Sequence, residues 1–316
     1  MMVKQFTILE GLLVMALRGR EVPKTKLGVE ASHATRLFFV FSIKFSVVKK
    51  KRKEGVLVII GGAENRTADS TILREFVRLS GGLKARIFVS AVASGYPLET
   101  ADSYLEVFRR LGVAEVAALD ITEREHGNDR KIIKLVERAT GVFFTGGSQT
   151  RITQILGGTE LDDLLHERYE NENLIVAGTS AGAAMMSHIM IAGGKPESAY
   201  HFGTVELAPG MNFVSGVLID QHFEQRGRLR RLLAAVAQYP RDLGIGIDEN
   251  TAIVVESDIL RVIGEGSVTI IDAGDITYSN LAHLNKNDML SLFGVKVHVL
   301  AAGYRFDLAN WKPLLD

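Results

Sequence analysis

The sequence contains no cysteine, and its formal net charge is zero. The absence of cysteine excludes disulfides, thiolate nucleophiles and Cys-ligated metals together. The 37 acidic and 37 basic residues balance, so overall charge favours neither nucleic acid nor an anionic membrane as a partner. We therefore expect no nucleic-acid and no membrane partner, and charges at the site must select the ligand. A chain without cysteine suits the cytoplasm, where we expect this protein to lie.

Long hydrophobic runs are also lacking. The first 54 residues hold two short apolar runs, ILEGLLVMAL and RLFFVFSIKFSVV, which Glu10 and Lys44 interrupt. Neither reaches the roughly 18 uninterrupted apolar residues of a membrane-spanning helix. The first run has no small-residue cleavage pattern after it, which argues against a signal peptide. The basic stretch KKKRK at residues 49–53 is typical of a solvated linker. We treat residues 1–54 as an N-terminal extension whose role the sequence does not define.

From Gly55 onward, short apolar runs alternate with amphipathic stretches of helical spacing, such as DSTILREFVRLSGG and RKIIKLVERA. The apolar runs are VLVIIGG (56–62), ARIFVSAVA (85–93), EVAALDI (115–121), GVFFTGG (141–147), LIVAGTS (174–180) and VLID (217–220). Continuous runs of this kind are typical of strands that are buried on both faces. The pattern predicts a three-layer α/β fold, in which helices cover both faces of a mostly parallel sheet.

After about residue 244 the pattern changes to closely spaced strands. They are GIGID, TAIVVES, ILRVIG, SVTIID and VKVHVLA. We expect these to form antiparallel pairs, either at one edge of the same sheet or as a small added layer. No internal repeat, low-complexity stretch or second domain is evident, so we take residues 55–316 as one domain.

The segment GTSAGA places Ser180 between Gly178 and Gly182, directly after an apolar run. A nucleophile on a tight strand-to-helix turn needs small neighbours, so that backbone does not block the substrate carbonyl. Free amides at the start of the following helix, from Ala181, would offer partial positive charge to an oxyanion. A tight turn also recruits Gly and Ser for purely structural reasons. The motif alone leaves both interpretations open.

A serine nucleophile needs a base, and His222 is the strongest candidate, since it follows the predicted strand VLID. A lone histidine at this position would more often be a packed residue at a helix start. Here, however, several polar and charged residues surround it, and the helix that follows carries an apolar face of leucines and valine. The arginines of that segment suit a carboxylate-bearing substrate, because a guanidinium fork matches a carboxylate. These neighbours are Asp220, Gln221, Arg226, Arg228 and Arg231.

A third cluster, FFTGGSQ, ends another predicted strand. Gly146 and Gly147 allow backbone amides to approach a ligand closely, and Gln149 can donate or accept without adding charge. An ordinary glycine turn could have the same sequence. This cluster therefore indicates a binding site only in combination with the clusters around Ser180 and His222.

Six segments in this order resemble the cyanophycinases, which belong to the serine peptidase family that also includes aspartyl dipeptidase. They are GGAE (61–64), FFTGGSQ (143–149), GTSAGA (178–183), MIAGG (190–194), DQHFEQRGR (220–228) and GIGIDENTA (244–252). The resemblance runs from about Val56 to near the C-terminus. It implies a peptidase domain at residues 55–316 with a class I glutamine amidotransferase-like fold, a cytoplasmic homodimer, and no cofactor.

The resemblance also implies a reaction and roles for individual residues. The reaction is hydrolysis of cyanophycin, a polyaspartate with arginine in isopeptide linkage on its side chains, to β-Asp-Arg dipeptides. Ser180 would be the nucleophile, His222 the general base and Glu197 the acid that orients the histidine. Gly147 and Ala181 would present oxyanion-hole amides. The substrate pocket would be lined by Gln149, Asp220, Gln221, Arg226, Arg228 and Arg231.

Two points stay open at the sequence level. The segment before Glu197 is about one residue shorter than the family pattern, so Asp248 or Glu249 is the alternative acid. The alternatives to cyanophycin hydrolysis are an aspartyl dipeptidase-like enzyme and a catalytically silent binder of acidic peptides. The close spacing of serine, acid and histidine and the lack of an HGGG-type segment argue against a lipase or esterase. No HExxH or similar set of ligands predicts a metal.

Overall fold

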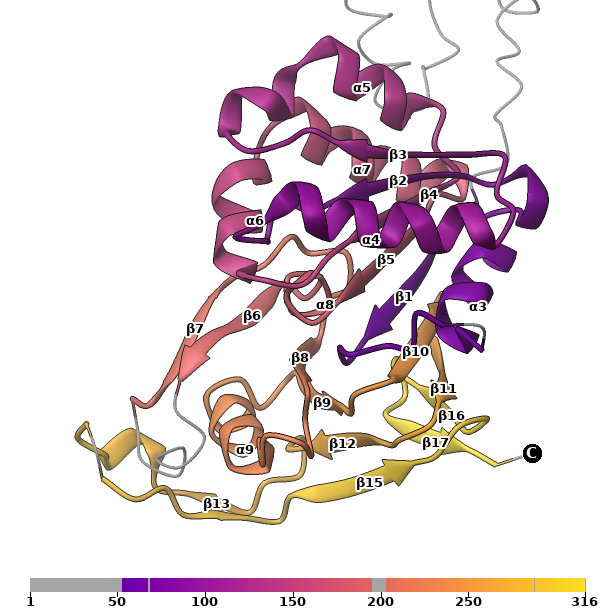
Figure 1. The fold of residues 1–316 in the computed structure, drawn as a ribbon. Coiled ribbons are helices and arrows are strands. Elements are labelled where there is room, and N and C mark those ends of the chain that lie inside the picture. Colours follow the sequence, from indigo (N-terminus) through magenta and orange to yellow (C-terminus); the bar gives the residue numbers. More distant parts are fainter. Residues whose placement is uncertain (1–52, 68, 195–202, 287, 316) are drawn as a thin grey trace, which may run out of the picture. The chain divides into compact units, whose positions relative to one another are not determined.

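The computed structural model describes residues 53–67, 69–194, 203–286 and 288–315 (Figure 1). Almost all of the predicted N-terminal extension, and Glu197 in the segment 195–202, therefore lie outside the described residues. Among the described residues, no helix is long and apolar enough to cross a membrane.

A nine-stranded sheet forms the centre of the fold, in the order β17-β16-β11-β10-β1-β5-β4-β2-β3. One half is parallel and consists of β1 (Val56–Ile60), β5 (Ile175–Thr179), β4 (Gly141–Phe144), β2 (Arg86–Ser90) and β3 (Glu115–Leu119). The antiparallel half continues from β1 through β10 (Thr251–Glu256), β11 (Ile259–Gly264), β16 (Arg305–Asp307) and β17 (Lys312–Leu314).

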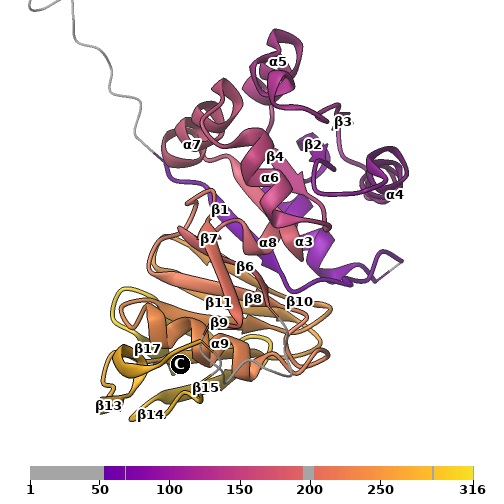
Figure 2. The same ribbon diagram turned by 90° about the vertical axis from the view of Figure 1, so that its left-hand side faces the viewer.

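Helices cover both faces of the parallel half, as predicted (Figures 1 and 2). Side chains of β1 alternate between two apolar clusters, because successive residues of a strand point to opposite faces. Val58 and Ile60 pack with residues of α3 (Thr71–Leu79) and α4 (Pro97–Arg110). Leu57 and Ile59 belong to the cluster that contains residues of α5 (Arg130–Glu137), α6 (Gln149–Leu156) and α7 (Glu160–Glu172). The three-layer α/β arrangement follows from this two-sided burial.

A second sheet of four strands has the order β15-β12-β9-β8. Its strands are β15 (Lys296–Leu300), β12 (Val268–Asp272), β9 (Leu243–Ile247) and β8 (Val217–Gln221), of which only β8 and β9 are parallel neighbours. Helix α9 (Leu229–Gln238) packs against it so closely that a side chain at Gly244 would meet Leu232 and Val236.

The prediction that the run VLID belongs to the main sheet is wrong. The run VLID was expected among the strands of the main sheet, but it forms β8 of the second sheet. A strand that is buried on both faces has the same apolar pattern in either sheet, so the pattern does not distinguish them. Both expectations for the C-terminal strands hold in part, because β10 and β11 extend the main sheet while β9, β12 and β15 form the added layer.

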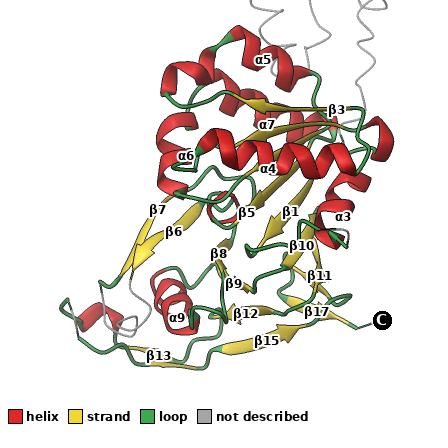
Figure 3. Cartoon of the chain, in the orientation of Figure 1, coloured by secondary structure: helices red, strands yellow, loops and turns green. Residues whose placement is uncertain are grey.

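Two antiparallel ribbons complete the fold (Figure 3). The ribbon of β6 (Ile189–Gly194) and β7 (Val205–Pro209) extends away from the main sheet, and β13 (Tyr278–Ser279) pairs with β14 (Leu292–Phe293). The short α8 (Ala181–Ala184) follows β5 directly. The described residues also form the 3-10 turns η1 (Gly82–Lys84), η2 (Arg124–Asn128) and η4 (Leu281–His283).

Candidate active site

Ser180 occupies the predicted turn between β5 and α8, at the carboxyl end of a parallel strand. Its φ of 54° and ψ of −109° lie where a residue with a side chain is strained. The flanking glycines are required by close backbone contacts: a Cβ at Gly178 would lie 2.2 Å from the Gly182 carbonyl oxygen, and one at Gly182 would lie 2.4 Å from that of Phe144. The G-x-S-x-G spacing thus permits a turn that presents the serine side chain.

His222 follows β8 and reaches the serine from the second sheet. Its Nε2 lies 2.9 Å from the Ser180 Oγ, and its backbone amide donates to the Gly61 carbonyl at 2.7 Å. The imidazole packs over Gly62, where an added Cβ would come within 2.4 Å of the ring. GGAE is one of the six segments of the family resemblance, which assigned no role to its glycines. The structure shows that a glycine at residue 62 makes room for the imidazole.

The other imidazole nitrogen of His222 contacts Glu249, with 2.5 Å between Nδ1 and Oε1. Glu249 lies between β9 and β10, and its amide donates to the Gln225 side-chain oxygen at 3.0 Å. Asp248, the other alternative acid, accepts hydrogen bonds from the Glu224 and Ser267 amides and the Ser267 hydroxyl. Of the two alternatives to Glu197, the structure brings Glu249 to the histidine and engages Asp248 elsewhere.

Burial lowers the pKa of His222 from its ordinary value, and the nearby Arg226 and Arg228 lower it further, although Glu249 opposes this shift. The imidazole is therefore neutral at neutral pH. The hydrogen-bond partners assign its tautomer, in which Nδ1–H donates to the carboxylate and Nε2 accepts from the serine hydroxyl. This protonation state is the one a general base requires.

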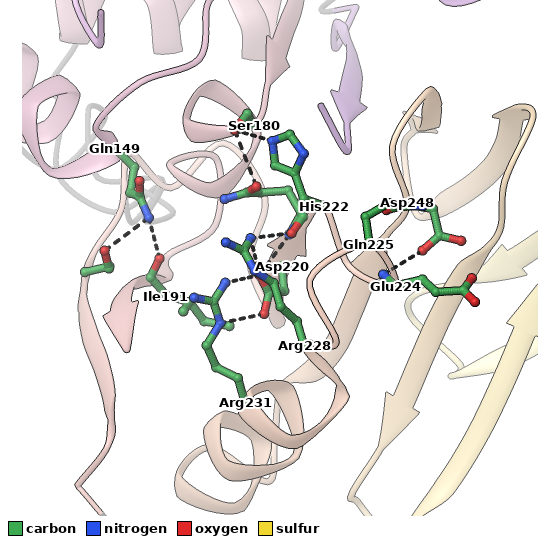
Figure 4. A network of polar contacts seen from close by, with 12 residues as sticks. Gln149, Ser180, Ile191, Asp220, His222, Glu224, Gln225, Arg228, Arg231 and Asp248 are labelled. Carbon is green, nitrogen blue, oxygen red and sulfur yellow. Dashed lines mark hydrogen bonds and ion pairs between the residues drawn. The ribbon is translucent and has the colours of Figure 1, made fainter. Parts of the chain in front are cut away.

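Asp220, Arg228 and Arg231 form a buried ionic cluster between β8 and α9 (Figure 4). The Asp220 carboxylate is 1% exposed and accepts from the Arg231 Nε at 2.9 Å and from the Arg228 Nη1 at 3.3 Å. Arg228 also donates to the Gln221 carbonyl. Burial lowers the pKa of Arg228 to about 10, with Arg231 and Arg226 adding to the shift and Asp220 opposing it, so the guanidinium stays charged at neutral pH. These three predicted pocket residues thus contact one another and carry one net positive charge.

The remaining predicted pocket residues lie differently. The Gln221 Oε1 is 3.4 Å from the Ser180 Oγ, so this side chain reaches the reacting group. The Gln149 Nε2 donates to the carbonyls of Ile191 and Ala192 on β6, at 2.8 and 3.2 Å. Arg226 is exposed and lines an open groove of about 990 Å³ beside the histidine loop.

The two predicted oxyanion-hole residues are Ala181, which directly follows the serine, and Gly147, which lies in the loop after β4. Gly147 is exposed with φ of 142°, and a Cβ there would lie 2.0 Å from the Ala93 carbonyl oxygen. Ala181 begins α8. Gly146 lies near the nucleophile, since a Cβ built on it would lie 3.8 Å from the Ser180 Oγ. A side chain on either glycine would therefore come against the serine side chain or the Ala93 backbone.

Comparison with known proteins agrees with this geometry. Residues 57–263 match peptidase family S51. The chain belongs to peptidase family S51. Like the other members of this family it is a serine-type peptidase. Within the described residues, no group of three or more His, Asp and Glu side chains is placed to hold a metal ion.

Curated relatives in the family are named cyanophycinase. The one from Trichormus variabilis is 40% identical over 253 residues, covering 80% of this chain and 85% of its own. The one from Geminocystis herdmanii is 37% identical over 268 residues, covering 84% and 98%. A solved peptidase structure from an acI-B1 actinobacterium superposes with a TM-score of 0.61 at 22% identity, covering 83% of this chain and all of that one, which shows a shared fold.

Proposed function

We propose that this protein is a cyanophycinase, which hydrolyses cyanophycin to β-Asp-Arg dipeptides through an acyl-enzyme on Ser180. The observation that carries the proposal is the hydrogen-bonded series Ser180, His222 and Glu249, with 2.9 and 2.5 Å between successive polar atoms. A nucleophile, a neutral base and an acid that orients the base are the three parts of a serine peptidase. The names of the curated relatives support the choice of substrate.

In the proposed cycle, His222 Nε2 accepts the Ser180 proton while the serine oxygen attacks an Asp–Asp main-chain carbonyl. Backbone amides at Gly147 and Ala181 stabilise the oxyanion. His222 then donates the proton to the departing amine, which leaves an ester on Ser180. A water molecule, deprotonated by His222, attacks the ester; the acyl group leaves as a carboxylate product, and His222 returns its proton to the Ser180 oxygen. Glu249 holds the imidazole in the required tautomer and stabilises the imidazolium that forms in each half.

The charge of the pocket suits this substrate. Cyanophycin carries both carboxylates and guanidinium groups, and the cluster of Asp220, Arg228 and Arg231 carries one net positive charge next to the serine loop. Because these side chains already pair with one another, we propose that Asp220 and Arg231 hold the pocket in shape, while Gln221 and Arg226 contact substrate directly. Gln149 contributes by fixing β6 against α6.

Product analysis after digestion of insoluble cyanophycin separates this proposal from its alternatives. A cyanophycinase releases β-Asp-Arg, whereas an aspartyl dipeptidase-like enzyme leaves the polymer intact and cleaves short peptides with N-terminal aspartate. A silent binder releases nothing and forms no adduct with a serine-directed fluorophosphonate. Adduct formation at Ser180 without release of β-Asp-Arg would refute cyanophycin as the substrate but would still support a serine peptidase.

We also propose a cytoplasmic homodimer and a class I glutamine amidotransferase-like fold, which the sequence resemblance implies. Sedimentation velocity of the purified chain tests the dimer. A single species with the mass of one chain, 34.6 kDa, would refute it.

A further inference from the structure

A pocket of about 500 Å³ opens beside the serine turn, apart from the Asp220 cluster. It is lined by Arg66 from the loop after β1, by Tyr96, Glu99, Thr100, Ser103 and Tyr104 at and around the start of α4, and by Gly146. Gly146 also lies against Ser180. Figures 1 and 2 both place α8, which begins next to the serine, between α4 and α9. The pocket lining shares no residue with the buried ionic cluster of Asp220, Arg228 and Arg231.

Arg66 is held in place before any ligand arrives. Its guanidinium lies over the Tyr104 ring, 4.9 Å from the ring centre, and its Nη1 donates to the Ser103 hydroxyl at 3.0 Å. Arg110 donates to the carbonyls of Arg66 and Thr67 and so fixes the backbone of this loop. A cation that is already oriented loses little entropy on binding an anion.

The aromatic platform beneath Arg66 is connected to the nucleophile. The Tyr104 hydroxyl donates to one oxygen of the buried Glu64 carboxylate, and the Thr179 hydroxyl donates to the other at 2.5 Å. Thr179 directly precedes Ser180. Burial and the Glu64 charge raise the pKa of Tyr104 well above its ordinary value, so its hydroxyl stays a donor. The position of this pocket wall is thus fixed relative to the serine.

The pocket presents one cation, Arg66, and one anion, Glu99, among hydroxyl groups. A ligand with a carboxylate for Arg66 and a cation for Glu99, both on one flexible branch, would match these two charges. Each branch of cyanophycin is an arginine joined through its α-amino group, which leaves a free α-carboxylate and a guanidinium. We propose that this pocket is a second substrate subsite that binds one arginyl branch, with the α-carboxylate on Arg66 and the guanidinium on Glu99. This inference rests on the proposed function and extends it.

Binding to the Ser180→Ala protein tests the subsite without turnover. The probe is a synthetic tri-aspartate with β-linked arginines, together with its analogue in which the arginine α-carboxylates are amidated. A charge-assisted hydrogen bond is worth roughly 10- to 100-fold in affinity. We expect Arg66→Gln to weaken binding of the acid probe by this factor and to leave the amide probe unchanged. Glu99→Gln should weaken binding of the arginine probe more than that of its β-linked citrulline analogue, whose side chain is neutral.

Matched controls come from the same helix. Arg109→Gln and Glu106→Gln remove exposed charges of α4 that do not line the pocket, and both should bind all probes as the parent does. Equal losses for the acid and amide probes in Arg66→Gln, or no loss, would overturn the subsite. Turnover of cyanophycin by the wild-type chain tests the proposed function separately. If the wild-type chain releases β-Asp-Arg but Arg66→Gln binds the probes as the parent does, the subsite is refuted and the proposed function stands.

Discussion

At the scale of single residues, His222 lies between charges of opposite sign. Glu249 contacts one ring nitrogen, while the charges of Arg226 and Arg228 disfavour protonation of the ring. The carboxylate orients the ring, and burial with the arginines keeps it unprotonated. Tautomer and protonation state are thus set by different neighbours. Each neighbour can be altered on its own.

Replacing Glu249 tests which acid orients the histidine. Glu249→Gln keeps the size of the side chain but removes the charge that stabilises the imidazolium, so we expect kcat to fall by about 10²- to 10⁴-fold with KM little changed. Glu197→Gln is the matched control and should retain full activity. A large loss in the Glu197 variant together with a mild one in the Glu249 variant would reverse the assignment.

The pH dependence of kcat/KM tests the lowered pKa of His222. The acid limb reports protonation of the base in the free enzyme, so its midpoint should lie below the ordinary histidine value of about 6.5. Arg226→Gln removes a cation that disfavours the imidazolium, which raises the pKa and moves the midpoint upward. Arg109→Gln, which removes a distant charge, should leave it in place. An acid limb that is unmoved or shifts downward in the Arg226 variant would contradict this account.

At the scale of elements, tight turns position the serine hydroxyl and the imidazole of the site. The G-x-S-x-G spacing predicted the strand, turn and helix around Ser180 correctly, because the requirement for small residues is local. The role of Gly62 was not predictable, since it depends on β8 of another sheet bringing the imidazole against this backbone. The burial of Asp220 and Arg231 was missed for a similar reason. Charged residues are seldom buried unless they are paired, and the sequence alone does not show their partners.

Gly62→Ala tests the fit of the imidazole against its turn. The added methyl would lie 2.4 Å from the ring and would displace His222, so we expect kcat/KM to fall by about 10²-fold or more. The control is Gly303→Ala, which has a similar positive φ, 91° against 103°, but no atom within 4 Å of the new methyl. Both variants should lose about 1 kcal/mol of unfolding free energy in urea. Equal activity losses would show that backbone strain, and not contact with the ring, is responsible.

Asp220→Asn tests the buried ionic cluster between β8 and α9. Removing the carboxylate charge leaves two largely buried arginines without their anion, so we expect the free energy of unfolding to fall by about 3–5 kcal/mol. Urea denaturation measures this, with the exposed Glu106→Gln as control. A loss of substrate affinity at unchanged stability would instead place Asp220 in direct contact with substrate.

At the scale of the whole molecule, the site lies where two sheets meet. Ser180 follows a strand of the main sheet, His222 follows a strand of the second sheet, and Glu249 lies where the chain passes from β9 back to β10 of the main sheet. Motif order singled out Ser180 and His222, whose side chains lie 2.9 Å apart in the structure. For the acid it gave Glu197, with Asp248 or Glu249 as the alternative, and only the register of the two sheets decides which of these two alternatives meets Nδ1.

The most direct test of the catalytic assembly compares wild-type and Ser180→Ala protein on insoluble cyanophycin, with β-Asp-Arg quantified over time. The wild-type chain should release this dipeptide, and the variant should be slower by several orders of magnitude while it keeps its unfolding midpoint. Release by the variant at the wild-type rate would contradict the account.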